Sequence, residues 1–488
     1  MQALRRFIPR GRFGRSVAVL AGGTALGQII VVLASPILTR LYGPDDFGVM
    51  AVYVSLLGIF SVVASLRYQL AIPLPREDGE AANVLTLSLA IVLLVSLSTG
   101  FVVWLFGGRI AEWVNAPALR PHLWLLPLGV GMVGTYQIFS YWAMRKRAFN
   151  QIARTKIFQG LGSVLTQLGL GFLGLGPIGL LLGQVVGQTA GTTALATLAW
   201  KRDGEDLRRV HASELRRMAI RYKRFPLFSS WSAVLNALSV QVPTLMLSLF
   251  FGSAITGLYA LSYRVMSLPM QFVGHSVAQV FLPTAVEAQR SGSIATTTEA
   301  IFKSLVQIAA PTLLLFALAA PELFAIVFGQ KWLEAGIYTQ WLAPWMFLLF
   351  VSAPLSMLPS VMEKQVQEAS FHGVLLLSRV GALSIGGLLN SERVAVGAFA
   401  GVSTLCWFIY VLWAVRLSGN KIRRVLAIVF REALAILPLA LPVVLAKMLT
   451  DRDLYVLGAT GLSSVFVLLR WAKKLRSRGG DEAEETGS

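Results

Sequence analysis

Apolar stretches long enough to cross a lipid bilayer recur along the whole chain. About 20 consecutive apolar residues span the hydrocarbon core as a helix. The sequence holds about fourteen such segments, with approximate limits 17–38, 47–66, 81–106, 122–143, 155–175, 177–200, 225–251, 257–282, 304–328, 337–361, 370–390, 394–415, 425–446 and 454–471. Because the hydrocarbon core offers no water to unpaired backbone groups, we expect each segment to be helical. The sequence therefore predicts an all-α polytopic membrane protein.

The composition leaves no room for a large soluble domain. Hydrophobic residues make up 55% of the 488 residues and charged residues only 14%, whereas soluble chains are about one quarter charged. The longest polar stretch is 201–224. A formal net charge of +19 would point to nucleic acid in a soluble protein, but here the basic residues lie in loops between apolar segments. We therefore expect no nucleic-acid partner.

Basic residues collect on one side of the predicted membrane. Clusters at 145–156, 201–224 and 421–424 fall in alternate loops, on the same side as the arginine-rich start of the chain. Loops rich in Lys and Arg stay in the cytoplasm, so both termini are predicted to be cytoplasmic. Segment 17–38 is long enough to be an uncleaved first helix rather than a signal peptide.

A short internal repeat divides the chain. The pattern apolar-aromatic-Gly-x4-Gly-x2-Ala occurs at 41–51 and again at 250–260, after the first helix of each half. Repeats of this kind form two lobes with the substrate between them in many transporters. The predicted parts are a six-helix lobe at 1–200, a basic cytoplasmic linker at 201–224, a second six-helix lobe at 225–416, two extra helices at 417–471 and a disordered acidic tail at 472–488.

Three motifs resemble a known family. LTRLYGPDDFG at 38–48, SLRYQLAIPLP at 65–75 and FGQKWLEAG at 328–336 are similar to segments of the bacterial polysaccharide transporters, the Wzx-type flippases of the multidrug/oligosaccharidyl-lipid/polysaccharide exporter superfamily. The resemblance implies a V-shaped cavity that opens alternately to the two sides of the bacterial inner membrane. It also implies an undecaprenyl-diphosphate-linked oligosaccharide as substrate, surrounding membrane lipids, and a glycan polymerase or chain-length regulator as partner.

Four arginines are candidate substrate-binding residues. Arg264 and Arg379 lie inside predicted spans, where a charge costs roughly 2.5–3.5 kcal/mol on insertion scales and so needs a reason. Arginine binds phosphate oxygens through paired, charge-assisted hydrogen bonds. Arg40 and Arg67 belong to the family-like motifs and are candidates for the rim of a cavity. The alternative for Arg264 and Arg379 is a structural role, in which they bond helix carbonyls or reach a water-filled crevice. The alternative for Arg40 and Arg67 is a role in topology or in anchoring helix ends.

Neutral polar residues form a second group of candidates. Gln28 lies in the first helix of the first lobe, and Asn236 and Gln241 lie in the first helix of the second lobe. Their amides can bond sugar hydroxyls or, alternatively, neighbouring helices. His275 is a candidate proton carrier or a hydrogen-bonded structural histidine. By contrast, the glutamine and glycine pattern at 183–191 predicts close helix packing.

Acidic residues argue against a cation transporter. Only Glu322 and Glu432 lie clearly within predicted spans, and both are toward helix ends. A multidrug or cation antiporter of the same fold would be expected to have a central carboxylate. A membrane polymerase or ligase is the other alternative, but it would need a large outer loop, which the sequence lacks.

We therefore predict a flippase rather than an enzyme, for O-antigen, exopolysaccharide or capsule precursors. No Gly-Lys-Ser/Thr phosphate loop and no metal-ligand spacing occur in the sequence. No cofactor or metal is expected, and coupling to H⁺ or Na⁺ is left open.

Overall fold

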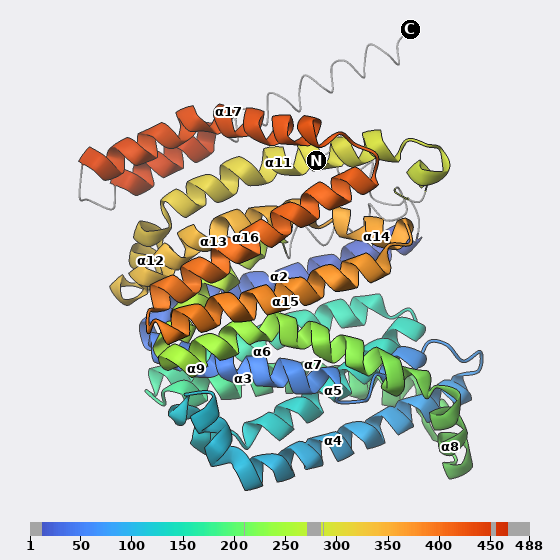
Figure 1. The fold of residues 1–488 in the computed structure, drawn as a ribbon. Coiled ribbons are helices and arrows are strands. Elements are labelled where there is room, and N and C mark those ends of the chain that lie inside the picture. The colour runs from blue at the N-terminus through green and yellow to red at the C-terminus, as the bar shows by residue number, and fades with distance from the viewer. Residues whose placement is uncertain (1–11, 209, 271–284, 286, 450–454, 467–488) are drawn as a thin grey trace. The chain divides into compact units, whose positions relative to one another are not determined.

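The structure is a computed structural model that describes residues 12–208, 210–270, 285, 287–449 and 455–466 (Figure 1). Over this part of the chain the regular structure is helical, with no strand. The long helices are α2 (Arg12–Leu41), α3 (Pro44–Val62), α4 (Asp78–Trp113), α5 (Leu125–Arg145), α6 (Phe149–Phe172), α7 (Pro177–Arg208), α9 (Ser230–Pro269), α11 (Ile294–Leu318), α13 (Leu333–Ser352), α15 (Gln365–Leu388), α16 (Glu392–Leu417) and α17 (Ile422–Leu449). Shorter helices are α8 (Ala212–Arg221), α12 (Ala320–Phe328), α14 (Leu358–Val361) and Tyr455–Phe466. The predicted all-α fold class is confirmed.

The predicted spans overlap helices wherever the structure describes them, but some limits differ. Most of span 225–251 and the start of 257–282 lie on α9, which is broken at Gly252. Span 304–328 covers the end of α11 together with α12. By length and apolar composition alone, 8 of the described helices could cross a membrane. Helices such as α6 and α7 are long as well but carry more polar residues, for example Gln159 and Gln188. The acidic tail predicted at 472–488 lies outside the described residues.

The chain forms two compact units. The first comprises residues 1–261 and 380–395, and the second comprises 262–379 and 396–488. The lobe limits read from the sequence stay predictions. Each unit is described separately below.

In the first unit, helices α2 and α6 run side by side in the same direction with small residues between them. A Cβ added to Gly23 would lie 2.5 Å from the Cβ of Ala153, and one added to Gly27 would lie 2.5 Å from the carbonyl oxygen of Lys156. On α6, Gly160 faces Gly27 in turn. Glycine allows this approach because it has no side chain, and close backbone packing drives helix association in lipid.

Helix α7 packs on α6 in the same manner. A Cβ on Gly187 would lie 2.8 Å from the carbonyl oxygen of Gln159, and one on Gly191 would lie 2.5 Å from the side-chain amide of the same residue. Gly183 faces Ser163 and Gln167. The close packing predicted for 183–191 is confirmed.

The two copies of the repeat meet within the first unit. Gly252 has a φ of 77°, and this left-handed residue breaks α9 into two helical parts. A Cβ on Gly48 would overlap the carbonyl oxygen of Ser253, and a Cβ on Gly257 would overlap the carbonyl oxygen of Pro44. Each glycine of one copy thus contacts the residue of the other copy that lies four positions before the equivalent glycine. The start of α3 and the second part of α9 therefore cross about a local two-fold axis, which the sequence repeat reflects.

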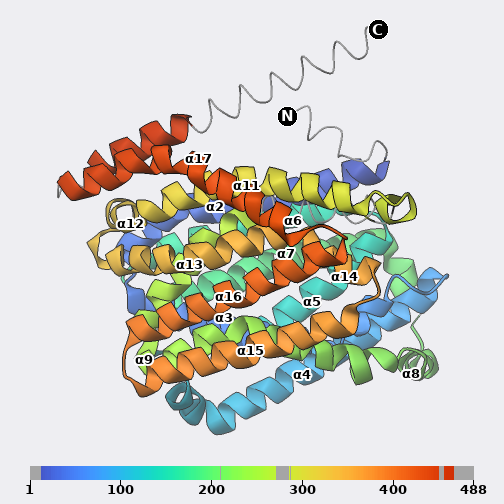
Figure 2. The same ribbon diagram turned by 45° about the horizontal axis from the view of Figure 1, so that its top comes forward.

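In the second unit, α17 lies along α11 (Figures 1 and 2). Polar contacts recur along this pair of helices, from Asn420 just before α17 to Glu322 of α12, which directly follows α11. They are Asn420 Nδ2 to the Ala295 carbonyl at 2.7 Å, Arg424 to Glu299 at 3.9 Å, Gln307 Nε2 to Glu432 at 2.7 Å, and Lys447 to Glu322 at 2.8 Å. The contacts are separated by a constant 125 positions in sequence, so the two helices are parallel and in register.

Helix Tyr455–Phe466 completes this arrangement. Leu315 and Ala319, at the end of α11, form a buried cluster with Val443 of α17 and Val456. The two C-terminal helices thus pack together on α11.

Substitution of Gly257 tests the crossing of the two repeats. Gly257→Ala would place a methyl group on the backbone of Pro44, and such overpacking costs typically about 1–3 kcal/mol. We expect a lower thermal unfolding midpoint for the purified protein in detergent. The control is Gly401→Ala, since a Cβ at Gly401 meets nothing within 4 Å. An unfolding midpoint of Gly257→Ala equal to that of the control would contradict the crossing.

Candidate functional site

The motif at 65–75 forms a strained turn. After α3 ends, Leu66 and Arg67 have φ values of 47° and 66°. A hydrogen bond of 3.0 Å from the Tyr68 N–H to the Ser65 carbonyl closes the turn. Left-handed backbone costs of order 1–3 kcal/mol at each non-glycine residue, so the surroundings must hold this conformation.

Side chains next to the turn hold it in place. Gln69 is 2% exposed and bonds both Ser65 and Gln137, the latter at 3.3 Å. The hydroxyl of Tyr68 donates to the carbonyl of Ala219 at 2.9 Å. The turn is therefore fixed to α5 and to α8.

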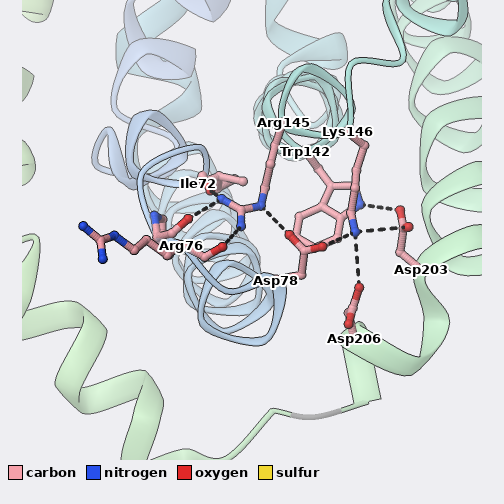
Figure 3. Close-up of polar contacts among 9 residues, drawn as sticks. Ile72, Arg76, Asp78, Trp142, Arg145, Lys146, Asp203 and Asp206 are labelled. Atoms are coloured by element: carbon pink, nitrogen blue, oxygen red, sulfur yellow. Dashed lines mark hydrogen bonds and ion pairs between the residues drawn. The ribbon is translucent and has the colours of Figure 1, made fainter.

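A single guanidinium group holds the chain beyond the turn. Figure 3 shows Arg145, in the last turn of α5, inside a ring of backbone carbonyls. It donates to the carbonyls of Ile72 at 3.4 Å, Pro75 at 2.6 Å and Arg76 at 3.2 Å. Its Nε also donates to Asp78 at 2.8 Å. A planar group with five donors is suited to such a set of acceptors.

Lys146 extends this network to α7 (Figure 3). Its ammonium contacts Asp78 at 2.7 Å, Asp206 at 3.2 Å and Asp203 at 3.4 Å, and the Trp142 indole donates to Asp203 at 2.8 Å. Burial alone lowers the pKa of Lys146, but the hydrogen bonds to Asp78 and Asp206 and the charge of Asp203 outweigh it and raise this pKa above its ordinary value. These cations are neutralised, so we assign the network a structural role.

The predicted linker at 201–224 contains a docked helix, α8. Arg217 and Arg221 contact the Glu80 carboxylate of α4 at 3.1 and 3.2 Å. The backbone N–H of His211 donates to Asn83 at 3.2 Å. The segment is therefore part of the first unit.

The first unit contains five of the predicted site residues. Arg40 and Asn236 are exposed, and Gln28 is half-buried. Gln241 is half-buried against α3, where a Cβ on Gly58 would lie 2.7 Å from its amide nitrogen.

Arg67, the fifth, projects from the strained turn. Its Nε is buried without a hydrogen-bond partner among the described residues. A buried unpaired donor is costly, so this arginine has bonding capacity that the fold does not use.

Arg379, in the second unit, is enclosed by its neighbours. It is 7% exposed, and its Nε donates to Ser403 at 3.0 Å. Its guanidinium carbon lies 4.8 Å from the Trp345 ring centroid and 5.3 Å from that of Phe399. Cation–π contacts of this kind stabilise a desolvated guanidinium group.

Arg264 is close in sequence to the same aromatic cluster. The adjacent residue, Tyr263, stacks on Trp345 with 6.0 Å between ring centroids. Arg264 is half-buried, and no carboxylate pairs with it in the part of the chain that the structure describes. His275 lies outside the described residues.

The sequence analysis did not single out one half-buried cation of α6. Lys156, counted above with the basic loop at 145–156, has its ammonium 4.6 Å from the Tyr136 ring centroid and 3.2 Å from Gln159 Oε1. A signal was available, because Lys156, Gln159, Ser163 and Gln167 recur at helical spacing and form a polar stripe along α6.

No group of His, Cys, Asp and Glu side chains is arranged to hold a metal ion in the described ranges. The candidate site residues described above carry guanidinium, ammonium or amide groups.

A family model described as polysaccharide biosynthesis protein matches residues 37–336. The chain belongs to this family. Among curated proteins, a 315-residue stretch is 28% identical to the succinoglycan biosynthesis transport protein ExoT of Rhizobium meliloti (strain 1021), over 62% of this chain and 59% of that protein. A 204-residue stretch is 22% identical to the teichuronic acid biosynthesis protein TuaB of Bacillus subtilis (strain 168), over 41% of this chain and 40% of that protein. The matches therefore span well under two thirds of these relatives.

The fold is shared with a solved flippase. The structure superposes on the lipid II flippase MurJ in an inward closed conformation with a TM-score of 0.75, over 94% of this chain and 99% of MurJ. The sequence identity is 12%, so this likeness concerns the fold. The family member described here is a multi-pass membrane protein with a flippase-like helical fold.

Replacement of Arg145 tests how the strained turn is held. Arg145→Lys keeps the charge but cannot reach the carbonyls of Ile72, Pro75 and Arg76 together. Since a hydrogen bond to a charged group contributes about 1.5–3 kcal/mol, we expect amide hydrogen exchange at 66–77 to accelerate at least about tenfold. Arg147→Lys, at an exposed neighbouring position, is the control. Unchanged exchange in Arg145→Lys would refute this assignment.

Proposed function

We propose that the protein is a flippase for undecaprenyl-diphosphate-linked oligosaccharide repeat units, which are precursors of O-antigen, exopolysaccharide or capsule. It moves them from the inner to the outer leaflet of the bacterial inner membrane by alternating access. Both termini lie in the cytoplasm. A glycan polymerase or chain-length regulator then receives the product.

The observation that carries this proposal is the family match over residues 37–336. One relative is described as a transport protein of succinoglycan biosynthesis, and another as a protein of teichuronic acid biosynthesis. Both names refer to the biosynthesis of a glycan. The fold supports transport rather than sugar transfer, because a solved flippase has the same arrangement over nearly the whole chain.

The charges of the two units fit an anionic cargo. Arg264 and Lys156 have no carboxylate partner among the described residues, whereas Glu322 and Glu432 are occupied by Lys447 and Gln307. A diphosphate offers oxygens that match the donors of arginine. Arg264 is therefore the residue that we propose to hold the diphosphate while the protein changes conformation.

The remaining sequence candidates stay proposed substrate contacts. They are Arg40, Arg67, Arg379, Gln28, Asn236, Gln241 and His275. We propose no cofactor, and coupling to H⁺ or Na⁺ is left open.

Transport is tested in a strain that lacks the gene. Polyprenyl-linked glycans are extracted, and an impermeant probe scores which leaflet they occupy. We expect completed repeat units to accumulate on the cytoplasmic face and the wild-type gene to restore transfer. Arg264→Gln should lower the rate at least about tenfold, which corresponds to the loss of about 1.4 kcal/mol, and Arg264→Lys should retain part of it.

The matched control is Arg147→Gln, an exposed arginine outside the proposed site. If repeat units reach the outer face without the protein but stay unpolymerised, flipping is the wrong function and an enzyme acting on the same lipid replaces it.

A further inference from the structure

The ammonium group of Lys156 lies between two helices of the first unit. It is 4.6 Å from the ring centroid of Tyr136 of α5 and 3.2 Å from Gln159 Oε1 of α6. Lys156 is about 10 Å from the start of α6 at Phe149. The side chain is half-buried, so the protein covers part of this charge.

A neighbouring amide on the same helix holds the charge. Side chains on a helix lean toward its N-terminus, so Gln159, three residues after Lys156, extends back and accepts a hydrogen bond from the ammonium.

The neighbours of Lys156 do not neutralise it. Gln159 is a neutral amide and donates to Gln188 Oε1 of α7 at 3.2 Å. The hydroxyl of Tyr136 is 3.0 Å from that of Thr155. No carboxylate lies within ion-pair distance of Lys156 among the described residues. A half-buried ammonium that no carboxylate neutralises has hydrogen-bonding capacity for an anion.

Further hydrogen-bond donors lie near Lys156. The ammonium has three N–H donors, of which the described residues engage one with Gln159. Gln188 acts as an acceptor toward Gln159, which leaves its own amide donors available. Gln28 lies at the same level of the bundle, because its neighbour Gly27 packs on the backbone of Lys156. All three side chains are half-buried.

We infer that Lys156, Gln188 and Gln28 form a binding site for an oxyanion carried by the substrate. Its ligand is a carboxylate or phosphate group, and the site belongs wholly to the first unit. The inference rests on the proposed function. It adds a second binding site for an anionic group of the substrate to the one proposed at Arg264.

The site is tested by measuring the thermal unfolding of the purified full-length protein in detergent. Two probes, sodium pyrophosphate and sodium glucuronate, are each compared with sodium chloride of equal ionic strength. We expect at least one probe to raise the thermal unfolding midpoint of the wild type in a saturable manner. Lys156→Gln should weaken the apparent affinity by about tenfold or more, which corresponds to one charge-assisted contact. Lys156→Arg keeps the charge and should retain most of the binding.

Lys303→Gln, at an exposed lysine of α11, is the matched control and should bind like the wild type. A Lys156 effect on glucuronate alone assigns the site to an acidic sugar, and an effect on pyrophosphate alone assigns it to the lipid diphosphate. The inference is overturned if neither probe binds the wild type, or if Lys156→Gln binds both probes as the wild type does. The leaflet assay tests the proposed function separately, because it asks whether the wild type restores transfer.

Discussion

Close contact between backbones at glycine is the interaction on which the first unit depends. Within lipid, apolar side chains gain little by leaving their surroundings, so helices associate through packing and polar contacts. Gly27 and Gly160 bring α2 onto α6, and Gly187 brings α7 onto α6. Gly48 and Gly257 let the two repeat copies cross. Polar side chains such as Lys156 and Gln188 occupy fixed positions because these contacts define the distances between their helices.

Much of the fold could be predicted from the sequence because the bilayer sets one length and one composition for every span. The repeat at 41–51 and 250–260 contains Gly48 and Gly257, but the pattern did not predict that its two copies cross. Lys156 was counted with the loop cations. Its contact with Tyr136, a residue of another helix, cannot be predicted from spacing within α6.

The pairing of acidic residues was likewise beyond sequence reasoning. Glu322 and Glu432 were recognised as acids within spans, but their partners lie 125 positions away. Contacts at such separation depend on which helices are neighbours, and composition does not determine this. These contacts bear on which substrates the protein can bind. A carboxylate that is bonded to a neighbouring helix is not available to bind a cationic substrate. The enclosure of Arg379 by Trp345, Phe399 and Ser403 is of the same kind.

Because α11 and α17 are joined by polar contacts at fixed positions, a related protein could lose α17 only if other residues changed as well. A chain that lost α17 would leave Glu322 of α12 without Lys447 and Gln307 of α11 without Glu432. Such a shortened relative must therefore also replace both of these polar groups with apolar residues. Insertion or deletion of a single residue within α17 would turn its remaining polar groups by 100° away from their partners. The C-terminal helices can diverge in sequence on their exposed face, but their length between Arg424 and Lys447 is constrained.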